Sequence, residues 1–249
     1  MVLHRDRTLT SRDHLPSWAL FAFSAGAVNS GALLACSRFV AHVTGTITRI
    51  GLDAGELLAL DYALVLFAFI AGAAAAILIV RRLDRYTRFA YWLPLTIVSF
   101  VIAGVAVAGA LGGFGRFGGS VETAHDFVLL AILSFAMGMQ NAAVGASTNN
   151  SVRTTHMTGP ATDIGVAVAM LATGTVSERE GARRSLLLRG TKLVAFIVGA
   201  GAMAVLCPRI GWLAFLLPAV TGVIATVRSY SPYVVREVEE AEAEASPNT

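Results

Sequence analysis

Six long apolar runs divide the chain, and short polar stretches separate them. Each run is close to the roughly 20 residues that a helix needs to cross a hydrocarbon core about 30 Å thick. The runs are too long and too uniformly apolar for barrel strands, and lipid offers no partner to an unpaired backbone group. The pattern therefore predicts an all-α integral membrane protein with six transmembrane helices. The runs are Leu15 to Ala35, Asp61 to Val80, Phe89 to Leu111, Phe127 to Ser147, Thr191 to Cys207 and Ile210 to Val227.

The composition agrees with this pattern. Hydrophobic residues make up 55% of the 249 residues and charged residues only 14%, whereas about a quarter of a soluble domain is charged. The net charge of +3 comes from short basic clusters between the runs, so we expect the lipid bilayer, and no nucleic acid, as a partner. No P-loop, Gly-x-Ser-x-Gly, Cys-x-x-Cys or His-Glu-x-x-His pattern occurs, and we therefore expect neither an enzyme nor a cofactor. A homo-oligomer is compatible with the sequence.

An internal repeat is the most informative feature of the sequence. The segment A-G-A-V-N-S aligns Gly26 and Asn29 with Gly138 and Asn141 of M-G-M-Q-N-A. Two further matches follow in the same order, which predicts a duplicated half of about 110 residues. They pair His42 to Gly51 (H-V-T-G-T-I-T-R-I-G) with His156 to Gly165 (H-M-T-G-P-A-T-D-I-G), and Ala68 to Ala73 (A-F-I-A-G-A) with Ala195 to Ala200 (A-F-I-V-G-A).

The distribution of Lys and Arg predicts the orientation, because cytoplasmic loops hold the excess. If the two His-x-Thr-Gly segments re-enter the membrane without crossing it, 15 of the 19 basic residues and both termini lie in the cytoplasm. If the segments cross, the four arginines between 81 and 88 lie on the other face. The six-span model is therefore preferred. Three spans in each half make the second copy insert upside down, as in the inverted 3+3 repeats of secondary transporters.

This model divides the chain into five parts. They are a polar N-terminal arm (1–14), a first membrane repeat (15–111), an external linker (112–126), a second membrane repeat (127–228) and an acidic C-terminal tail (229–249). Leu33 to Cys36 resemble a lipoprotein cleavage box, but the apolar stretch is longer than that of a signal peptide, so the first run is expected to remain. For Cys36 and Cys207 we favour free thiols over a disulfide.

The His-x-Thr-Gly segments have the chemistry of a solute site. Glycine lets the backbone bend or approach a ligand, and threonine suits the N-cap of a short helix. A helix that begins inside the membrane offers free N–H groups to an anion or a polar solute. The predicted solute-binding residues are Asn29, His42, Thr44, Gly45, Asn141, His156, Thr158 and Gly159. Arg49 and Asp163 occupy equivalent positions with opposite charge, and we expect them to pair across the pseudo-twofold axis.

Other interpretations of these residues stay open. The two histidines could be hydrogen-bonded to loop backbone, and the two asparagines could join helices rather than bind a ligand. Gly26 with Ser30 and Gly138 with Ala142 have the spacing of close helix packing. Two histidines and one aspartate are too few and too scattered for a metal site, so none is expected.

The paired His-x-Thr-Gly segments, each with Gly-x-x-Asn upstream, resemble the bacterial YoaK-type membrane proteins (DUF1275), a family of unknown function. The resemblance covers roughly residues 15 to 228 and implies a multi-pass protein of the bacterial inner membrane. Family members often carry Asn after the first Thr-Gly, where this chain has Thr46. The leading functional hypothesis is a secondary transporter or channel for a small polar or anionic solute. The alternatives are a membrane scaffold or assembly protein and, third, an intramembrane enzyme with a histidine base.

Overall fold

The computed structural model describes residues 9–10, 14–83, 90–119 and 123–230. Most of the predicted N-terminal arm, the arginines at 85 and 88, and nearly all of the predicted acidic tail lie outside these residues. Every regular element in the described part is helical. The elements are α2 (Leu15–Cys36), α3 (Val43–Leu52), α4 (Leu57–Leu83), α5 (Trp92–Ala110), α6 (Ala124–Ser147), α7 (Thr158–Thr173), α8 (Val176–Ile210), the 3-10 helix η1 (Gly211–Phe215) and α9 (Leu216–Tyr230).

The described residues of each predicted apolar run form helices, except that residues 90, 91 and 111 are turns at the two ends of α5. The largest difference is at α8. This helix begins at Val176, well before the apolar run that starts at Thr191. Thr175 and Glu178 form a capping box, in which each side chain accepts a hydrogen bond from the other residue's backbone N–H. Such a box supplies partners to the free N–H groups of a helix start. The polar first half of α8 is therefore helical because of its cap, although its sequence is not apolar.

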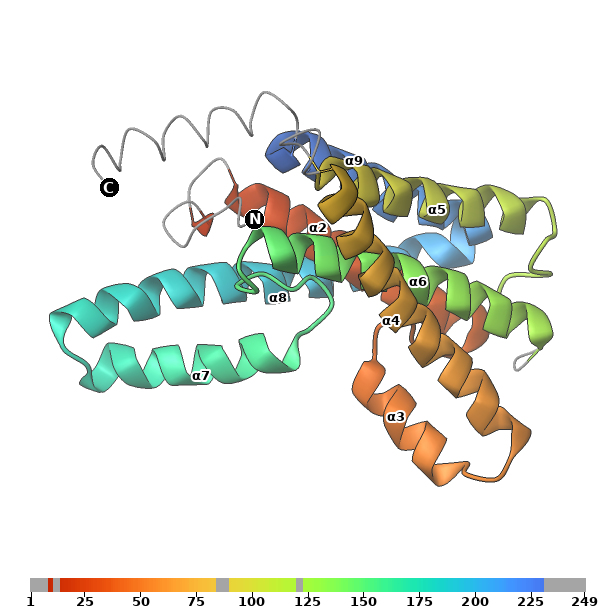
Figure 1. The fold of residues 1–249 in the computed structure, drawn as a ribbon, viewed down its shortest axis with the longest axis horizontal. Coiled ribbons are helices and arrows are strands. Elements are labelled where there is room, and N and C mark those ends of the chain that lie inside the picture. Colours follow the sequence, from red (N-terminus) through yellow and green to blue (C-terminus); the bar gives the residue numbers. More distant parts are fainter. Residues whose placement is uncertain (1–8, 11–13, 84–89, 120–122, 231–249) are drawn as a thin grey trace.

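The two central helices are α2 and α6, which occupy corresponding places in the two sequence repeats (Figure 1). The apolar 18-residue stretches of α2 and α6 are 61% and 72% buried, against 22% for that of α4. Helix α2 packs mainly on α8, and α6 packs mainly on α4. Helices α5 and α9 lie side by side. The short helices α3 and α7 pack on α4 and α8 respectively, and the two resulting hairpins project from the bundle in different directions.

Glycines make the crossing of α2 and α8 unusually close. A Cβ atom added at Gly26 would lie 2.1 Å from the backbone oxygen of Phe196. A Cβ atom added at Gly199 would likewise lie 2.1 Å from the backbone oxygen of Phe23. The two backbones thus touch directly, which is the role that small residues have in membrane helix packing.

The crossing of α4 and α6 repeats this arrangement. Cβ atoms added at Gly72 and Gly138 would lie 2.0 Å from the backbone oxygens of Phe135 and Phe69. All four glycines follow a phenylalanine by three residues. One Phe-x-x-Gly pattern in each of four helices therefore produces two equivalent crossings, each of which joins a helix of one repeat to a helix of the other.

The helices have the length and apolarity of membrane spans. Among the described residues five segments qualify, and the last of them, Val176–Tyr230, has 55 residues and contains α8, η1 and α9. Large apolar side chains such as Phe67, Ile70 and Ile197 are more than half exposed on α4 and α8, which is the surface that lipid would cover. The chain is a multi-pass, all-helical membrane protein.

Candidate functional site

A cavity of about 530 Å³ lies where the two His-x-Thr-Gly segments meet the helix crossings. Residues from both sequence repeats line it. They are Asn29, Phe39, Ala41, His42, Val43, Thr44, Phe69, Asn141, Arg153, Thr155, His156, Met157, Thr158 and Phe196.

The lining consists of seven pairs of residues at equivalent positions of the two repeats. Five pairs are separated by 114 residues and come from the segments ahead of and at the start of α3 and α7. The asparagines form the sixth pair, and Phe69 with Phe196 forms the seventh. Both of these phenylalanines belong to the close helix crossings. A cavity that takes matched residues from both halves lies between the halves, with each repeat contributing one side.

The two asparagines hold the segments that precede the short helices. The side-chain Oδ1 of Asn29 accepts a hydrogen bond from the backbone N–H of Ala41, at 3.1 Å. The Oδ1 of Asn141 accepts one from the backbone N–H of Thr155, at 3.3 Å. Each asparagine lies one turn beyond a crossing glycine. The side-chain carbonyl of each asparagine therefore holds the backbone of a segment that lines the cavity. The asparagines themselves, which lie on α2 and α6, also line it.

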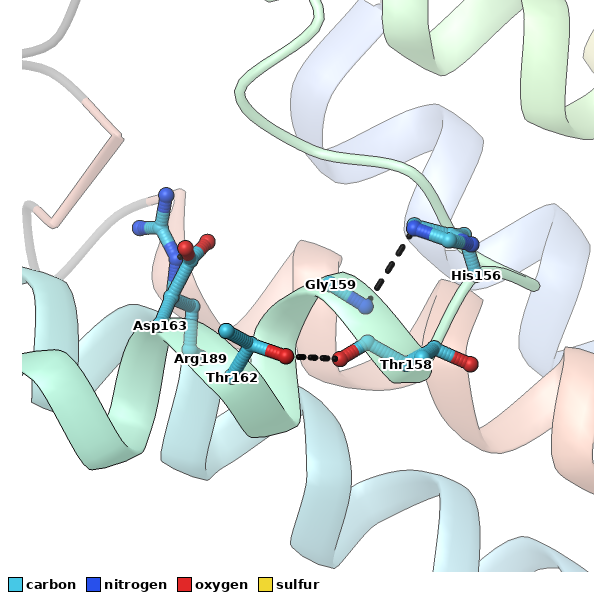
Figure 2. Close-up of polar contacts among 6 residues, drawn as sticks. All are labelled: His156, Thr158, Gly159, Thr162, Asp163 and Arg189. Atoms are coloured by element: carbon cyan, nitrogen blue, oxygen red, sulfur yellow. Dashed lines mark hydrogen bonds and ion pairs between the residues drawn. The ribbon is translucent and has the colours of Figure 1, made fainter.

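The histidine of each motif folds back over the first turn of the short helix that follows it. The Nε2 atom of His156 accepts a hydrogen bond from the backbone N–H of Gly159, at 3.2 Å (Figure 2). A Cβ atom at Gly159 would lie 2.8 Å from this Nε2 atom, and one at Gly45 would lie 2.1 Å from the ring of His42. The motif needs glycine because the ring occupies the space of a side chain. The alternative interpretation of His156 expected a hydrogen bond to loop backbone, whereas this one comes from the backbone of α7.

The threonines lie inside the short helices rather than at their N-caps. Helix α3 begins at Val43 with His42 as N-cap, and α7 begins at Thr158 with Met157 as N-cap. The expectation that the threonines Thr44 and Thr158 serve as N-caps is therefore wrong, because Thr44 is the second residue of α3 and Thr158 is the first residue of α7. Both threonines still line the cavity. Gly45 and Gly159, in contrast, are absent from its lining and act through the histidine rings.

Asp163 has a different ion partner from the predicted one. Its carboxylate lies 2.5 Å from the Nε atom of Arg189 on α8 (Figure 2). Arg49 is exposed on the last turn of α3, which packs on α4. The predicted Arg49–Asp163 pair is not formed because each short helix packs on the long helix of its own repeat. Neither charge reaches across to the other half.

Sequence reasoning missed about half of the lining residues. The alignment by 114 residues extends back from the histidines to Phe39 and Arg153, and this extension was the signal for them. Phe69 and Phe196 lie within the aligned A-F-I segments. Phenylalanine in an apolar run is typical of packing, so these two residues carry no separate signal of a site. Arg153 is the cationic residue of the lining, and its Nη2 atom donates a hydrogen bond to Oδ1 of Asn150, at 3.1 Å.

The cavity offers polar groups on an apolar wall. Amide, hydroxyl, imidazole and guanidinium groups come from the lining, beside the rings of Phe39, Phe69 and Phe196. Pockets for small molecules commonly have this composition. Among the described residues no three His, Cys, Asp or Glu side chains are grouped as a metal site would require. Cys36 and Cys207 are free and buried, away from this cavity.

Comparison with known proteins places the chain in a family. No curated protein and no solved structure matches it. The family model described as "Protein of unknown function (DUF1275)" matches residues 18–227. The resemblance that the paired His-x-Thr-Gly segments indicated is thereby confirmed, and the match covers most of the chain. The chain belongs to the DUF1275 family of proteins of unknown function.

Proposed function

We propose that this protein is a secondary transporter or channel for a small polar or anionic solute, and that the cavity between the two halves is the solute site. The observation that carries the proposal is the lining, in which seven pairs of equivalent residues from both repeats surround one cavity. Transporters built from repeats bind their solute near the midplane, at the interface of the repeats and beside broken helices. If the two halves move against each other, a cavity that both repeats share would open first to one face of the membrane and then to the other.

The proposal includes an inverted 3+3 topology with six spans. Helices α2, α4 and α5 are the spans of the first half, and α6, α8 and α9 with η1 are those of the second. At 1.5 Å per residue, the 10 residues of α3 and the 16 residues of α7 reach roughly 15 and 24 Å, short of a 30 Å core. The equivalent crossings of α2 with α8 and of α6 with α4 support the pairing of the halves.

In this topology both termini face the cytoplasm of a bacterial inner membrane. The arrangement keeps Arg81 and Arg82, at the end of α4, on the same side as the basic first half of α8. It places Arg38, Arg116 and Arg209 outside. The basis is the excess of Lys and Arg in cytoplasmic loops. No catalytic activity and no cofactor belong to this proposal.

A scaffold or assembly protein is the second candidate, and one set of contacts favours it. The asparagines bond to the backbone, the crossing glycines pack against backbone, and His156 accepts from Gly159. Each of these motif residues therefore has a structural role that needs no solute. The two threonines distinguish the candidates. Both line the cavity, and their hydroxyl groups take no part in the contacts just named.

Uptake into proteoliposomes tests the proposal. Purified protein is reconstituted and screened with labelled amino acids, carboxylates, inorganic anions and neutral polar solutes, with protein-free liposomes as the control. We expect accumulation of at least one class. Thr44→Val and Thr158→Val keep the side-chain shape and remove the hydroxyl, so they should weaken solute binding by about 1–3 kcal/mol if the hydroxyl is a ligand. No flux of any solute would favour the scaffold, whereas flux with unchanged affinity in both variants would contradict a solute site at the two threonines.

A further inference from the structure

A groove of about 730 Å³ lies on the outer surface of the bundle and shares no lining residue with the cavity between the halves. Helix α2 forms its floor, because α8 and α9 both pack on α2 and scarcely on each other (Figure 1). Four residues of one face of α2, five of one face of α8, and Ile224 and Arg228 of α9 line the groove. Apart from Thr191 and Arg228 the lining is apolar. We call this space the α2–α8–α9 groove.

One end of the α2–α8–α9 groove lies at the boundary of the membrane. Pro16 and Gly190 lie within two residues of the start of their apolar runs, and Arg228 directly follows the end of one. From this end the lining extends as far as Phe23 on α2 and Val198 on α8. At 1.5 Å per residue these helix lengths are roughly 10 and 12 Å, within the depth of about 15 Å that one leaflet contributes to the hydrocarbon core. The groove therefore runs along the acyl chains of a single leaflet.

The walls of the groove are suited to an acyl chain. The side chains of Val194, Val198 and Ile224 are between 45% and 60% exposed on the surface that lipid would cover. A Cβ atom added at Gly190 would meet open space, so the backbone of α8 leaves room at the boundary end. The surface of a membrane span that no other helix covers is in contact with lipid. An acyl chain is therefore the occupant that the apolar walls favour.

The boundary end of the groove carries a positive charge. Arg228 is exposed, and its guanidinium group forms no hydrogen bond or ion pair within the described part of the chain. None of the described residues that line the groove is acidic. Arginine near the end of a membrane helix extends toward the headgroups, and the planar guanidinium group fits phosphate. The charge at this end is therefore complementary to an anionic lipid headgroup.

We infer that the α2–α8–α9 groove binds one anionic phospholipid, with an acyl chain along α2 and the phosphate on Arg228. In the proposed topology this end of the groove faces the cytoplasm, and the anionic lipids of the cytoplasmic leaflet attract basic residues beside a membrane helix. The inference goes beyond the proposed function, because the lipid site requires neither a solute nor transport.

Native mass spectrometry of the full chain in neutral detergent tests the inference, because it resolves bound lipids and the oligomeric state together. The protein is titrated with phosphatidylglycerol and, separately, with phosphatidylcholine that has the same acyl chains. We expect one phosphatidylglycerol molecule to bind more tightly than further copies and more tightly than phosphatidylcholine. Arg228→Gln should weaken this first binding about fivefold, since the attraction of a basic residue to an anionic lipid is lost. Arg228→Lys keeps the charge and should retain most of the preference.

Gly190→Leu tests the groove rather than the charge. Gly190 lines the groove and a side chain there enters open space, so leucine should fill the boundary end without a clash and weaken the first binding of both lipids. Leucine also has a higher helix propensity than glycine, so the variant should remain folded. Arg183→Gln is the matched control for charge, because it removes an exposed arginine of α8 outside the groove. It should bind both lipids as the wild type does.

Equal affinity of the wild type for the two lipids would overturn the inference. A loss of binding in Arg228→Gln without any loss in Gly190→Leu would contradict the groove, since surface charge alone would then hold the lipid. A loss in Gly190→Leu with an unchanged preference for phosphatidylglycerol in Arg228→Gln would contradict the role of Arg228. A change of oligomeric state in Gly190→Leu, with lipid binding as in the wild type, would assign the groove to a second copy of the chain instead.

Discussion

Replacing a crossing glycine by alanine tests the packing that holds the two halves together. In Gly26→Ala the new methyl group would lie 2.1 Å from the backbone oxygen of Phe196. An ordinary carbon–oxygen contact is about 3.3 Å, so α2 and α8 must separate by roughly 1 Å. A gap of that size forfeits a quarter to a half of the dispersion attraction along the contact. The clashing atom belongs to the backbone, and no side chain can rotate out of the way.

The expected cost follows from two opposing terms. Overpacking of a well-packed interface costs about 1–3 kcal/mol, and the higher helix propensity of alanine returns about 0.5–1 kcal/mol. The difference is about 0–2.5 kcal/mol, and because the clash is with rigid backbone we expect Gly26→Ala to lose about 1–2 kcal/mol of unfolding free energy. Gly199→Ala should lose a similar amount. The double variant should lose less than the sum, because one separation of the helices relieves both clashes.

Thermal unfolding in detergent measures this effect, and a third glycine supplies the control. Gly201 lies on α8, two residues from Gly199, and an added Cβ would meet open space. Gly201→Ala should leave the midpoint unchanged or raise it slightly, whereas the crossing variants should lower it by roughly 2–8 °C. Midpoints of Gly26→Ala and Gly199→Ala equal to that of the wild type would refute the close crossing.

Three further predictions concern the site and the topology. Gly159→Ala should displace the ring of His156 and lose the hydrogen bond to Nε2, which lowers the unfolding midpoint; unchanged stability would contradict the capping role. Asp163→Asn should lower the unfolding free energy by about 0.5–1 kcal/mol, as expected for a partly exposed ion pair. Arg49→Gln should cause no measurable loss in the same unfolding assay. Equal losses in the two variants would indicate that Arg49 and Asp163 pair with each other after all. Arg82→Cys, in a background without Cys36 and Cys207, should react with a membrane-impermeant maleimide only after the membrane is opened, and labelling of intact cells would contradict a cytoplasmic end of α4.

The sequence contains enough information for the helices and for many of the residues that come together. Apolar runs fix the spans because lipid excludes unpaired backbone, and the duplication pairs Asn29 with Asn141 by alignment alone. The structure places both of them, together with the histidines and threonines of the motifs, on one cavity. Whether a solute binds there stays a prediction.

Other features could not be predicted, for physical reasons. Hydrophobic periodicity does not indicate which helix of one half packs on which helix of the other. The sequence therefore does not predict the contact between Gly26 and the backbone of Phe196. Hydropathy alone does not register the polar start of α8, for which the Thr-x-x-Glu pattern of Thr175 and Glu178 was the available signal. The partner of Asp163 depends on the packing of α7 on α8, and alignment of Arg49 with Asp163 shows equivalence in sequence, not contact in space.

Blocking the cavity between the halves tests the central claim most directly. Ala41→Trp and Thr155→Trp each add a large ring to the lining from one half, whereas Val194→Trp adds the same ring at an exposed position of α8 outside this cavity. All three variants are reconstituted and compared in uptake of a solute that the wild type accumulates. The account predicts that both cavity variants lose uptake and that Val194→Trp retains it. Wild-type uptake in Ala41→Trp and Thr155→Trp, at equal reconstituted amounts of protein, would contradict a solute site between the two halves.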